Sequence, residues 1–176
     1  NIKNIEIFSE NLKKEKLINF KANESQLFSI IKNYKLYQLL DKDLSKSKFF
    51  KSKFSIEKNL SFLNKYDLVI NCDPFNFITK RYFSKKISKE YNSTAYTTII
   101  SHDEIINDTA VQIFTKKGPL AFLPISNNKT SIVYSARGSK NIDISFLIKK
   151  FNLRYSNIKI SKISSFELKS SNLRSY

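Results

Sequence analysis

The chain has 176 residues, of which 41% are hydrophobic and 14% aromatic, so it can bury a core as one domain, or as one domain plus part of another. No apolar run approaches the roughly 20 residues of a bilayer span, which argues against a transmembrane helix. The single cysteine, Cys72, excludes an internal disulfide, and the chain shows no basic-then-apolar leader, so we expect a cytoplasmic protein.

The net charge of +16 invites a nucleic-acid interpretation. Only four of the 31 basic residues are arginine, however, whereas proteins that read DNA grooves favour the forked guanidinium. Lysine, asparagine, isoleucine and phenylalanine are abundant and glycine is scarce, as expected of an A/T-rich genome. We therefore predict no nucleic-acid partner, and attraction to anionic lipid headgroups stays open.

The first 22 residues contain two short runs in which apolar and polar side chains alternate. Ile5–Phe8 and Leu17–Phe20 flank a charged linker, residues 10–16. Alternation of this kind is typical of strands, so residues 1–22 are expected to form an edge hairpin that joins the sheet.

A helix is expected to follow, over residues 24–44. Asn23, with Gln26 three residues later, resembles a capping box. Apolar residues then recur at helical spacing and predict one core-facing stripe. The stripe consists of Leu27, Ile30, Ile31, Tyr34, Tyr37, Leu40 and Leu44.

The next forty residues carry weaker signals. Residues 45–65 are rich in lysine and serine and contain short apolar runs, and we expect one or two strands and a loop there. Tyr66–Cys72 is predicted to be a compact buried strand ending in a turn at Asp73, and Phe75–Ser84 to be a short helix. Together, residues 23–84 are interpreted as one part of the chain.

A sheet domain is predicted over residues 85–168. The Thr-rich run Ser93–Ser101 is one strand, and Thr109–Gly138 contains three more, joined by turns at Gly118-Pro119 and at Ser126–Lys129.

The middle strand of these three is apolar on both faces, which suits a strand that is covered on both sides. A two-residue turn at Asn127-Asn128 would set Pro124 opposite Ser131, where proline cannot donate the ladder bond. The sequence therefore predicts either a longer loop or a gap in the ladder there.

The end of the chain returns to helical spacing. Residues 142–155 are predicted to be a helix with Asp143 in its first turn, where a carboxylate is favoured. Residues 158–168 are expected to form a last strand, and residues 169–176 a returning segment. The fold class is therefore α+β, with a mixed, largely antiparallel sheet and a few helices.

Several kinds of catalytic site lack the necessary residues. His102 is the only histidine and, beside Asp103 and Glu104, is expected to be a surface residue rather than a base. With one cysteine, no thiolate metal site is predicted. Gly118 and Gly138 are the only glycines, which excludes a GxGxxG turn or a P-loop within these residues.

Residues 66–138 nevertheless resemble a known enzyme family. Phe114–Pro124 reads F-T-x-x-G-P-L-A-x-L-P. Together with Asp67–Asp73, Tyr91–Ile100 and Ser131–Tyr134, this run resembles the FAD-dependent 2-polyprenylphenol hydroxylases of ubiquinone biosynthesis. These enzymes are class A flavoprotein aromatic hydroxylases. The resemblance covers the middle of such an enzyme. It implies part of the FAD-binding domain over residues 23–84, and over residues 85–168 the substrate-domain portion of an FAD/NAD(P)-binding fold. The family's glycine-rich unit and its second flavin motif are expected outside residues 1–176.

The resemblance also implies cofactor-binding residues. The family's Asp-Gly-x-x-Ser-x-x-Arg motif corresponds to Asp73, with Pro74 in place of glycine, Phe77 in place of serine, and Lys80 at the arginine position beside Arg81. Asp73, Lys80 and Arg81 are thus the implied FAD contacts. Because proline removes an N–H and a backbone geometry that glycine permits, a plain strand-ending turn is the alternative.

The implied activity is hydroxylation of the aromatic ring of a polyprenylphenol, with FAD as cofactor and NAD(P)H as reductant. One face of the sheet would pack on helices, and the other would cover the ring and exclude water. The expected lining residues are Tyr96, Phe114, Pro119 and Phe122. Peripheral contact with the inner membrane, or with a complex of ubiquinone-biosynthesis enzymes, is also implied. The alternative is a non-catalytic sheet module that binds a lipid-like or aromatic ligand.

Residues 1–176 alone are predicted to bind FAD poorly, because both phosphate-cradling loops of the family would lie outside them. A fluorescence titration of FAD with this chain measures the affinity. Binding in the micromolar range or tighter would contradict the prediction.

Overall fold

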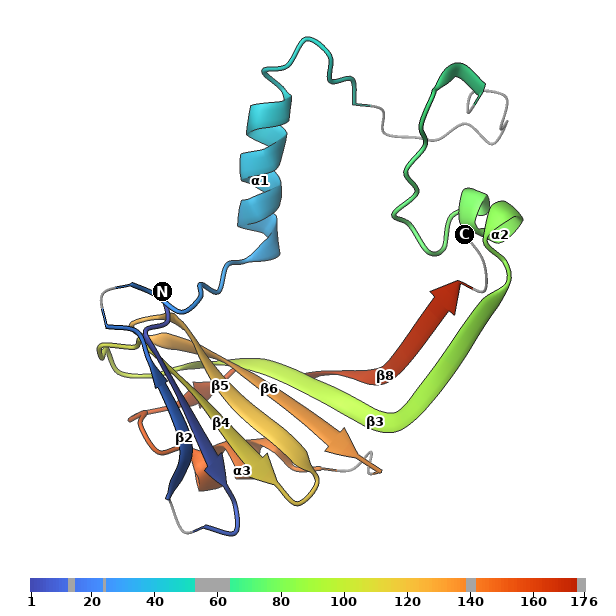
Figure 1. Ribbon diagram of the computed structural model, residues 1–176. Helices are drawn as coiled ribbons and strands as arrows, with labels where there is room; N and C mark the ends of the chain where they lie inside the picture. Colours follow the sequence, from blue (N-terminus) through green and yellow to red (C-terminus); the bar gives the residue numbers. More distant parts are fainter. Residues whose placement is uncertain (13–14, 24, 53–63, 139–141, 174–176) are drawn as a thin grey trace. The chain divides into compact units, whose positions relative to one another are not determined.

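The computed structural model describes most of the chain, and these residues fall into two compact units (Figure 1). Unit 1 comprises Asn1–Lys32 and Glu90–Lys169, and unit 2 comprises Asn33–Lys89 and Ser170–Tyr176. The described residues contain one eight-stranded sheet and three helices, which confirms the predicted α+β class. They are residues 1–12, 15–23, 25–52, 64–138 and 142–173.

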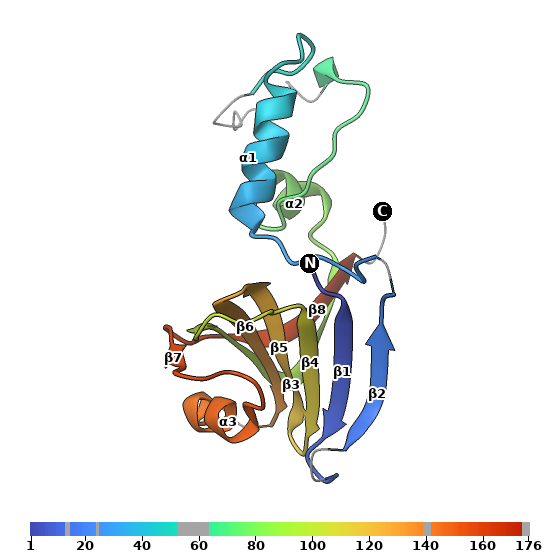
Figure 2. The ribbon, with the colours of Figure 1, turned by 90° about the vertical axis from the view of Figure 1, so that its left-hand side faces the viewer.

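The sheet has the strand order β2-β1-β4-β5-β6-β3-β7, and β8 pairs with β3. β1 lies parallel to β4, whereas the pairs β1–β2, β4–β5, β5–β6, β3–β6 and β3–β7 are antiparallel. The expected N-terminal hairpin is confirmed, with β2 at the sheet edge (Figure 2). The strands are β1 (Asn4–Ser9), β2 (Lys16–Lys21), β3 (Lys86–Ser101), β4 (Thr109–Thr115), β5 (Gly118–Ser126), β6 (Lys129–Arg137), β7 (Lys159–Ile160) and β8 (Ser164–Leu173).

Gly118 is the first residue of strand β5 and is not part of the turn that precedes this strand. The turn between β4 and β5 is Lys116-Lys117, because Thr115 already faces Gly118, so the predicted turn at Gly118-Pro119 is wrong by two residues. Gly118 has φ +144°, and a Cβ built there would lie 1.9 Å from the carbonyl oxygen of Ser135. Only glycine permits this backbone approach without strain.

A β-bulge resolves the difficulty at Pro124. The two-residue turn at Asn127-Asn128 is present, since Ser126 faces Lys129. The register then shifts between Pro124 and Ser126, so that Pro124 faces Thr130 instead of Ser131. Bulges are among the few places where a sheet accepts proline, because the ladder is already interrupted there.

The core lies between one face of the sheet and helix α3 (Ile144–Phe151) (Figure 2). The Asp143 side chain caps α3 by accepting a hydrogen bond from Phe146 N at 2.9 Å, and the helix is shorter than the predicted 142–155. Each large buried side chain stabilises the fold by about 1.5–3 kcal/mol. The cluster includes Tyr96, Ile100, Leu120, Phe122, Ile132, Tyr134, Ile144, Ile148 and Tyr155.

A chain of buried polar groups closes one end of this core. The Tyr155 hydroxyl donates to Asn107 Oδ1 at 3.1 Å, and Asn107 Nδ2 donates to Thr130 Oγ1 at 3.0 Å. His102 places Nε2 3.0 Å from Thr130 Oγ1 and Nδ1 2.8 Å from the Asp103 carbonyl, which can only accept. The expectation that His102 is a surface residue is therefore wrong, because it is buried and hydrogen-bonded at both nitrogens. Burial also raises the pKa of Tyr155.

The helix predicted over residues 24–44 begins later than expected. Helix α1 spans Asn33–Leu44, and the residues before it are drawn into a β-bridge. Leu27 N donates to Ile2 O, and Ile2 N donates to Phe28 O, both at 2.8 Å. The stripe predicted to face a core is not buried, since α1 has no buried residue.

Other expectations for unit 2 have mixed outcomes. The short helix is confirmed as α2 (Phe77–Tyr82), capped by Asn76. Tyr66–Cys72 forms no strand and is largely exposed, because no described strand lies beside it to pair with it. The strands expected near residues 53–63 fall outside the described residues. No described helix is long and apolar enough to span a bilayer.

Replacing Gly118 with alanine is expected to destabilise the fold by about 3 kcal/mol or more, because the new Cβ collides with the Ser135 carbonyl. Gly138→Ala is the matched control: Gly138 also has positive φ, +74°, but nothing lies within 4 Å of its added Cβ, so the cost should be about 1 kcal/mol. Urea unfolding followed by circular dichroism compares the two, and equal losses would contradict this account.

Candidate functional site

The second face of the sheet carries many apolar side chains beside a few polar ones, such as Gln112 and Ser131, and is not covered by a helix of unit 1. Side chains alternate along a strand, so the residues that do not face the core share the opposite face. The only helix in the described part of unit 1, α3, packs on the core face. We call the other face the open face. Its members include Ile5, Ile7, Ile18, Phe20, Phe114, Pro119, Ala121, Leu123 and Val133, all of them at least partly exposed.

The four expected lining residues divide between these two faces. Phe114 and Pro119 face each other across β4 and β5 on the open face, and Phe114 is 46% exposed. Phe122 is 2% exposed and stacks on Tyr155 in the core, with ring centroids 6.2 Å apart. Tyr96 is also a core residue, beside Tyr134. The structure thus brings only Phe114 and Pro119 together on a surface that a ligand can reach.

A shallow cavity of about 330 Å³ lies at the turn end of the open face. Pro119 and Ser135 lie on this face, and both line the cavity. The cavity is lined by Ser93, Thr115, Lys116, Lys117, Gly118, Pro119, Ser135, Arg137 and Leu168.

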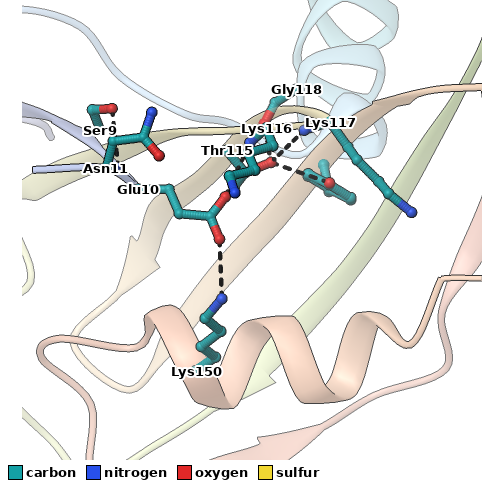
Figure 3. Close-up of polar contacts among 9 residues, drawn as sticks. Ser9, Glu10, Asn11, Thr115, Lys116, Lys117, Gly118 and Lys150 are labelled. Atoms are coloured by element: carbon teal, nitrogen blue, oxygen red, sulfur yellow. Dashed lines mark hydrogen bonds and ion pairs between the residues drawn. The ribbon is translucent and has the colours of Figure 1, made fainter.

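Glu10 fixes the turn that borders this cavity (Figure 3). Its Oε2 accepts from the backbone N of Lys116 at 3.0 Å, and its Oε1 accepts from Lys150 Nζ at 3.0 Å. Its own N donates to Phe114 O at 3.0 Å. The Lys116 backbone N–H, helped by Lys150, lowers the pKa of Glu10. One carboxylate therefore ties β1, the β4–β5 turn and α3 together.

The Thr115 hydroxyl stabilises the same turn through hydrogen bonds to its backbone. Its hydroxyl donates to the carbonyl of Gly118 at 2.7 Å and accepts from Lys117 N at 3.3 Å, and it lies 3.2 Å from the Tyr134 hydroxyl. Thus the threonine and the glycine of the F-T-x-x-G-P run both shape the turn beside the cavity. This run can be explained by backbone geometry without any ligand.

The loop at Asp73 lies in unit 2, and polar groups of this loop form hydrogen bonds with one another. Asp73 Oδ1 accepts from Phe75 N at 2.8 Å, and the Asp73 carbonyl accepts from the Thr79 hydroxyl. Lys80 is exposed, and the Arg81 guanidinium lies 5.9 Å from the centroid of the neighbouring Tyr82 ring. The loop and the helix after it offer one carboxylate and two cations. Their role in binding FAD stays a prediction.

These residues do not fit FAD by themselves. Close approach of a pyrophosphate to the backbone requires glycine, and both glycines of the chain lie in unit 1, Gly118 at the start of β5 and Gly138 directly after β6. The loop that follows Asp73 begins with Pro74, which has no N–H to offer. Within the described residues, no group of histidine, cysteine and acidic side chains could hold a metal ion.

Comparisons with known proteins identify no family. No protein-family model matches the chain, and no curated protein matches it. Nine chains of solved structures match, among them the crystal structure of tetracycline destructase Tet(51), with 11% sequence identity and a TM-score of 0.35. That match covers 56% of this chain and 31% of the other, so the chain spans under a third of that protein. A likeness at this level carries no argument for function.

Sequence reasoning missed the residues that build the cavity. Glu10 is separated from Lys116 by 106 positions, and no local pattern connects them. No pattern in the sequence distinguishes Lys117 and Arg137 from the other basic residues of the chain. The spacing of Thr115 and Gly118 was the one signal that pointed to this turn.

Glu10→Gln is expected to destabilise the fold by about 1 kcal/mol at neutral pH, because it removes the charge from two hydrogen bonds. The folded-state pKa of Glu10 is lowered, so its contribution is present above the unfolded value of 4.5 and is lost as pH falls through the folded value. The difference between wild type and variant should therefore vanish in acid.

Two measurements check this prediction: urea unfolding as a function of pH, and hydrogen exchange of the Lys116 amide, which should lose protection. Glu6→Gln is the matched control, because among the described residues the Glu6 carboxylate bonds the exposed Lys16 ammonium and no other side chain. A similar loss in both variants would rule out the special role of Glu10.

Proposed function

We propose that this chain forms the substrate-facing sheet of an FAD-dependent monooxygenase that hydroxylates the aromatic ring of a polyprenylated phenol. The observation that carries the proposal is the open face: a broad apolar surface, backed on its other side by a packed core. The resemblance of Phe114–Pro124 to the polyprenylphenol hydroxylases supports the choice of reaction. Flavin contacts are proposed to come mainly from segments outside residues 1–176.

The chemistry of the open face suits a ring with a long apolar tail. Phe114 and Pro119 are register partners across β4 and β5, so the strands place an aromatic ring and a pyrrolidine ring on the same face, which favours stacking of a phenol. Leu123 and Val133 continue the face across β5 and β6, and Ile18 extends it to the edge strand. An apolar cover of this kind excludes water from a reacting ring.

The roles proposed for individual residues follow from these placements. Phe114 and Pro119 position the ring, whereas Phe122 and Tyr96 support the sheet from the core. Asp73, Lys80 and Arg81 are proposed to contribute polar contacts to FAD, with NAD(P)H as the reductant. The lysine-rich surface is proposed to favour peripheral contact with the inner membrane, where such a substrate would dissolve.

A non-catalytic module that binds a lipid-like or aromatic ligand is the second candidate. It is favoured by the absence of a metal cluster or a nucleotide cradle within the described residues. The same open face would then serve binding alone. The two candidates differ in whether flavin accompanies the protein.

The test is to express the complete reading frame that contains this chain and record its visible spectrum and its oxidation of NAD(P)H. We expect bound flavin, and NAD(P)H oxidation that a polyprenylphenol stimulates. Phe114→Ala should lower kcat/KM for this substrate about tenfold, because the ring loses its stacking partner. Phe166→Ala is the matched control, because Phe166 is similarly exposed, at 53% against 46% for Phe114, but lines a different cavity beside Tyr96.

A complete reading frame that carries no flavin would overturn the enzymatic proposal and favour the module. Equal effects of the two phenylalanine variants would instead remove the open face from the substrate site.

A further inference from the structure

The outer edge of β2 offers a row of backbone groups to a further strand. β2 lies at the end of the sheet, and among the described strands it pairs only with β1 (Figure 2). All six of its residues are exposed. An edge of this kind can accept another strand, and the direction of its backbone groups determines which residues would bond to that strand.

The hydrogen bonds of β1 show which way its backbone groups point. Asn4 N donates to Asp108 O at 3.2 Å, on the side of β4. Backbone groups alternate in direction along a strand. Those of Ile5 and Ile7 therefore point the other way, toward β2.

The same alternation continues in β2. The register partners of the two isoleucines are Phe20 and Ile18, so the backbone groups of these two residues bond β1. Asn19 and Lys21 therefore direct their N–H and C=O groups away from the sheet. Leu17 follows at the same spacing and, at the bulge of β2, has no register partner in the described strand β1. The outward-facing residues of β2 are thus Leu17, Asn19 and Lys21.

These directions select one way in which two copies of β2 can pair. In an antiparallel pair about a two-fold axis, outward-facing residues must meet outward-facing residues. Only the register with Asn19 on the axis engages all three of them, because Asn19 then faces itself and Leu17 faces Lys21 of the other copy. A register that sets Lys16 opposite Lys21 joins an outward-facing residue to one outside this row, and it also brings like charges together.

The side chains favour the same register. On the open face, Ile18 of each copy lies opposite Phe20 of the other. This is a non-hydrogen-bonded pair, in which the side chains approach most closely, and aromatic and β-branched residues form favourable cross-strand pairs. Ile18 and Phe20 are each 49% exposed in the single chain, so their pairing removes apolar surface of both copies from water.

The net charge determines how such a pair responds to salt. In the register centred on Asn19, no lysine of β2 faces another lysine, because Lys21 lies opposite Leu17 and Lys16 lies opposite Ala22. Each copy nevertheless carries a formal net charge of +16, and this charge repels the other copy at long range. Salt screens that repulsion, so association should strengthen as salt is added.

We propose that this protein forms a two-fold dimer in which the β2 edges of two copies pair antiparallel, with Asn19 on the axis. The two eight-stranded sheets then become one continuous sheet, and the open face extends across both copies. Pairing occupies the β2 edge of both copies, so no third copy can add there. The inference is independent of the proposed function, because it uses only the backbone of β2 and its exposed side chains.

The first experiment is sedimentation equilibrium of residues 1–176 at rising protein concentration, in low and in high salt. We expect a monomer–dimer equilibrium with a Kd on the order of 10–100 µM, because one pair of strands buries little surface. The dimer should be stronger in high salt.

A proline on the axis tests the backbone bonds. Asn19→Pro should weaken the dimer at least about tenfold, because proline removes an N–H that bonds the other copy and that makes no ladder bond within its own sheet. Asn19→Ala is the matched control: it keeps the N–H and should change the Kd less than about twofold. Circular dichroism spectra check that both variants are folded.

Cysteine cross-linking tests the register and does not depend on the proline variant. In a Cys72→Ser background, Asn19→Cys brings two Cα atoms to about 5.5 Å across the axis, within the range of a disulfide. Lys21→Cys is the matched control, because residue 21 of each copy lies four residues along the strand from the other, about 14 Å away. Oxidation should convert the Asn19→Cys variant to a covalent dimer and leave the Lys21→Cys variant mainly monomeric.

A chain that stays monomeric throughout the concentration range would overturn the proposal. Equal cross-linking at the two positions, or equal weakening by the proline and the alanine variant, would overturn it as well. Dissociation of the dimer by added salt would indicate association through ion pairs and would have the same consequence. None of these outcomes bears on flavin binding by the complete reading frame, so failure here is distinguishable from failure of the proposed enzyme.

Discussion

The pleat of β4, β5 and β6 is the constraint on which the rest of this structure depends. Successive side chains must leave a strand on opposite sides, and α3 covers only one of those sides. A run such as Leu120–Ile125, apolar at every position, therefore cannot bury all of its side chains against α3. Its alternate residues enter the core, and the others form an apolar surface that suits a ligand or a further layer of protein.

The sheet could be predicted from the sequence because its signals are local. Alternation, paired asparagines and a proline near a turn predicted the strands between residues 93 and 137, and even the irregularity at Pro124. The stretch from Leu27 to Cys72, which runs from unit 1 into unit 2, was less predictable. The helical stripe that begins at Leu27 competes with backbone bonds to Ile2, and a pattern within one segment cannot reveal a partner 25 residues away. Tyr66–Cys72 likewise has the composition of a strand but no described neighbour.

The candidate site shows the same division between local and distant information. The family-like run indicated Phe114, Pro119 and Phe122 together as lining residues. In the folded sheet, Phe114 and Pro119 lie on the open face and Phe122 lies in the core. The role of Gly118 depends on the carbonyl of Ser135, 17 positions later, so the sequence showed a turn residue where the structure has a close contact between strands. The Lys116 N–H and the Lys150 ammonium that bind the Glu10 carboxylate lie 106 and 140 positions away, so this contact also exists only in the folded chain.

The exposed edge strand has a consequence for how this protein behaves at high concentration. β2 carries Leu17, Ile18 and Phe20, and no described strand pairs with the backbone groups along its outer side, which makes it a template for self-association. If two copies met antiparallel about the middle of this strand, Lys16 of one would lie opposite Lys21 of the other, and like charges in that position repel. The lysines at the two ends of β2 thus act as gatekeepers against aggregation, and the large positive charge of the chain favours its colloidal solubility.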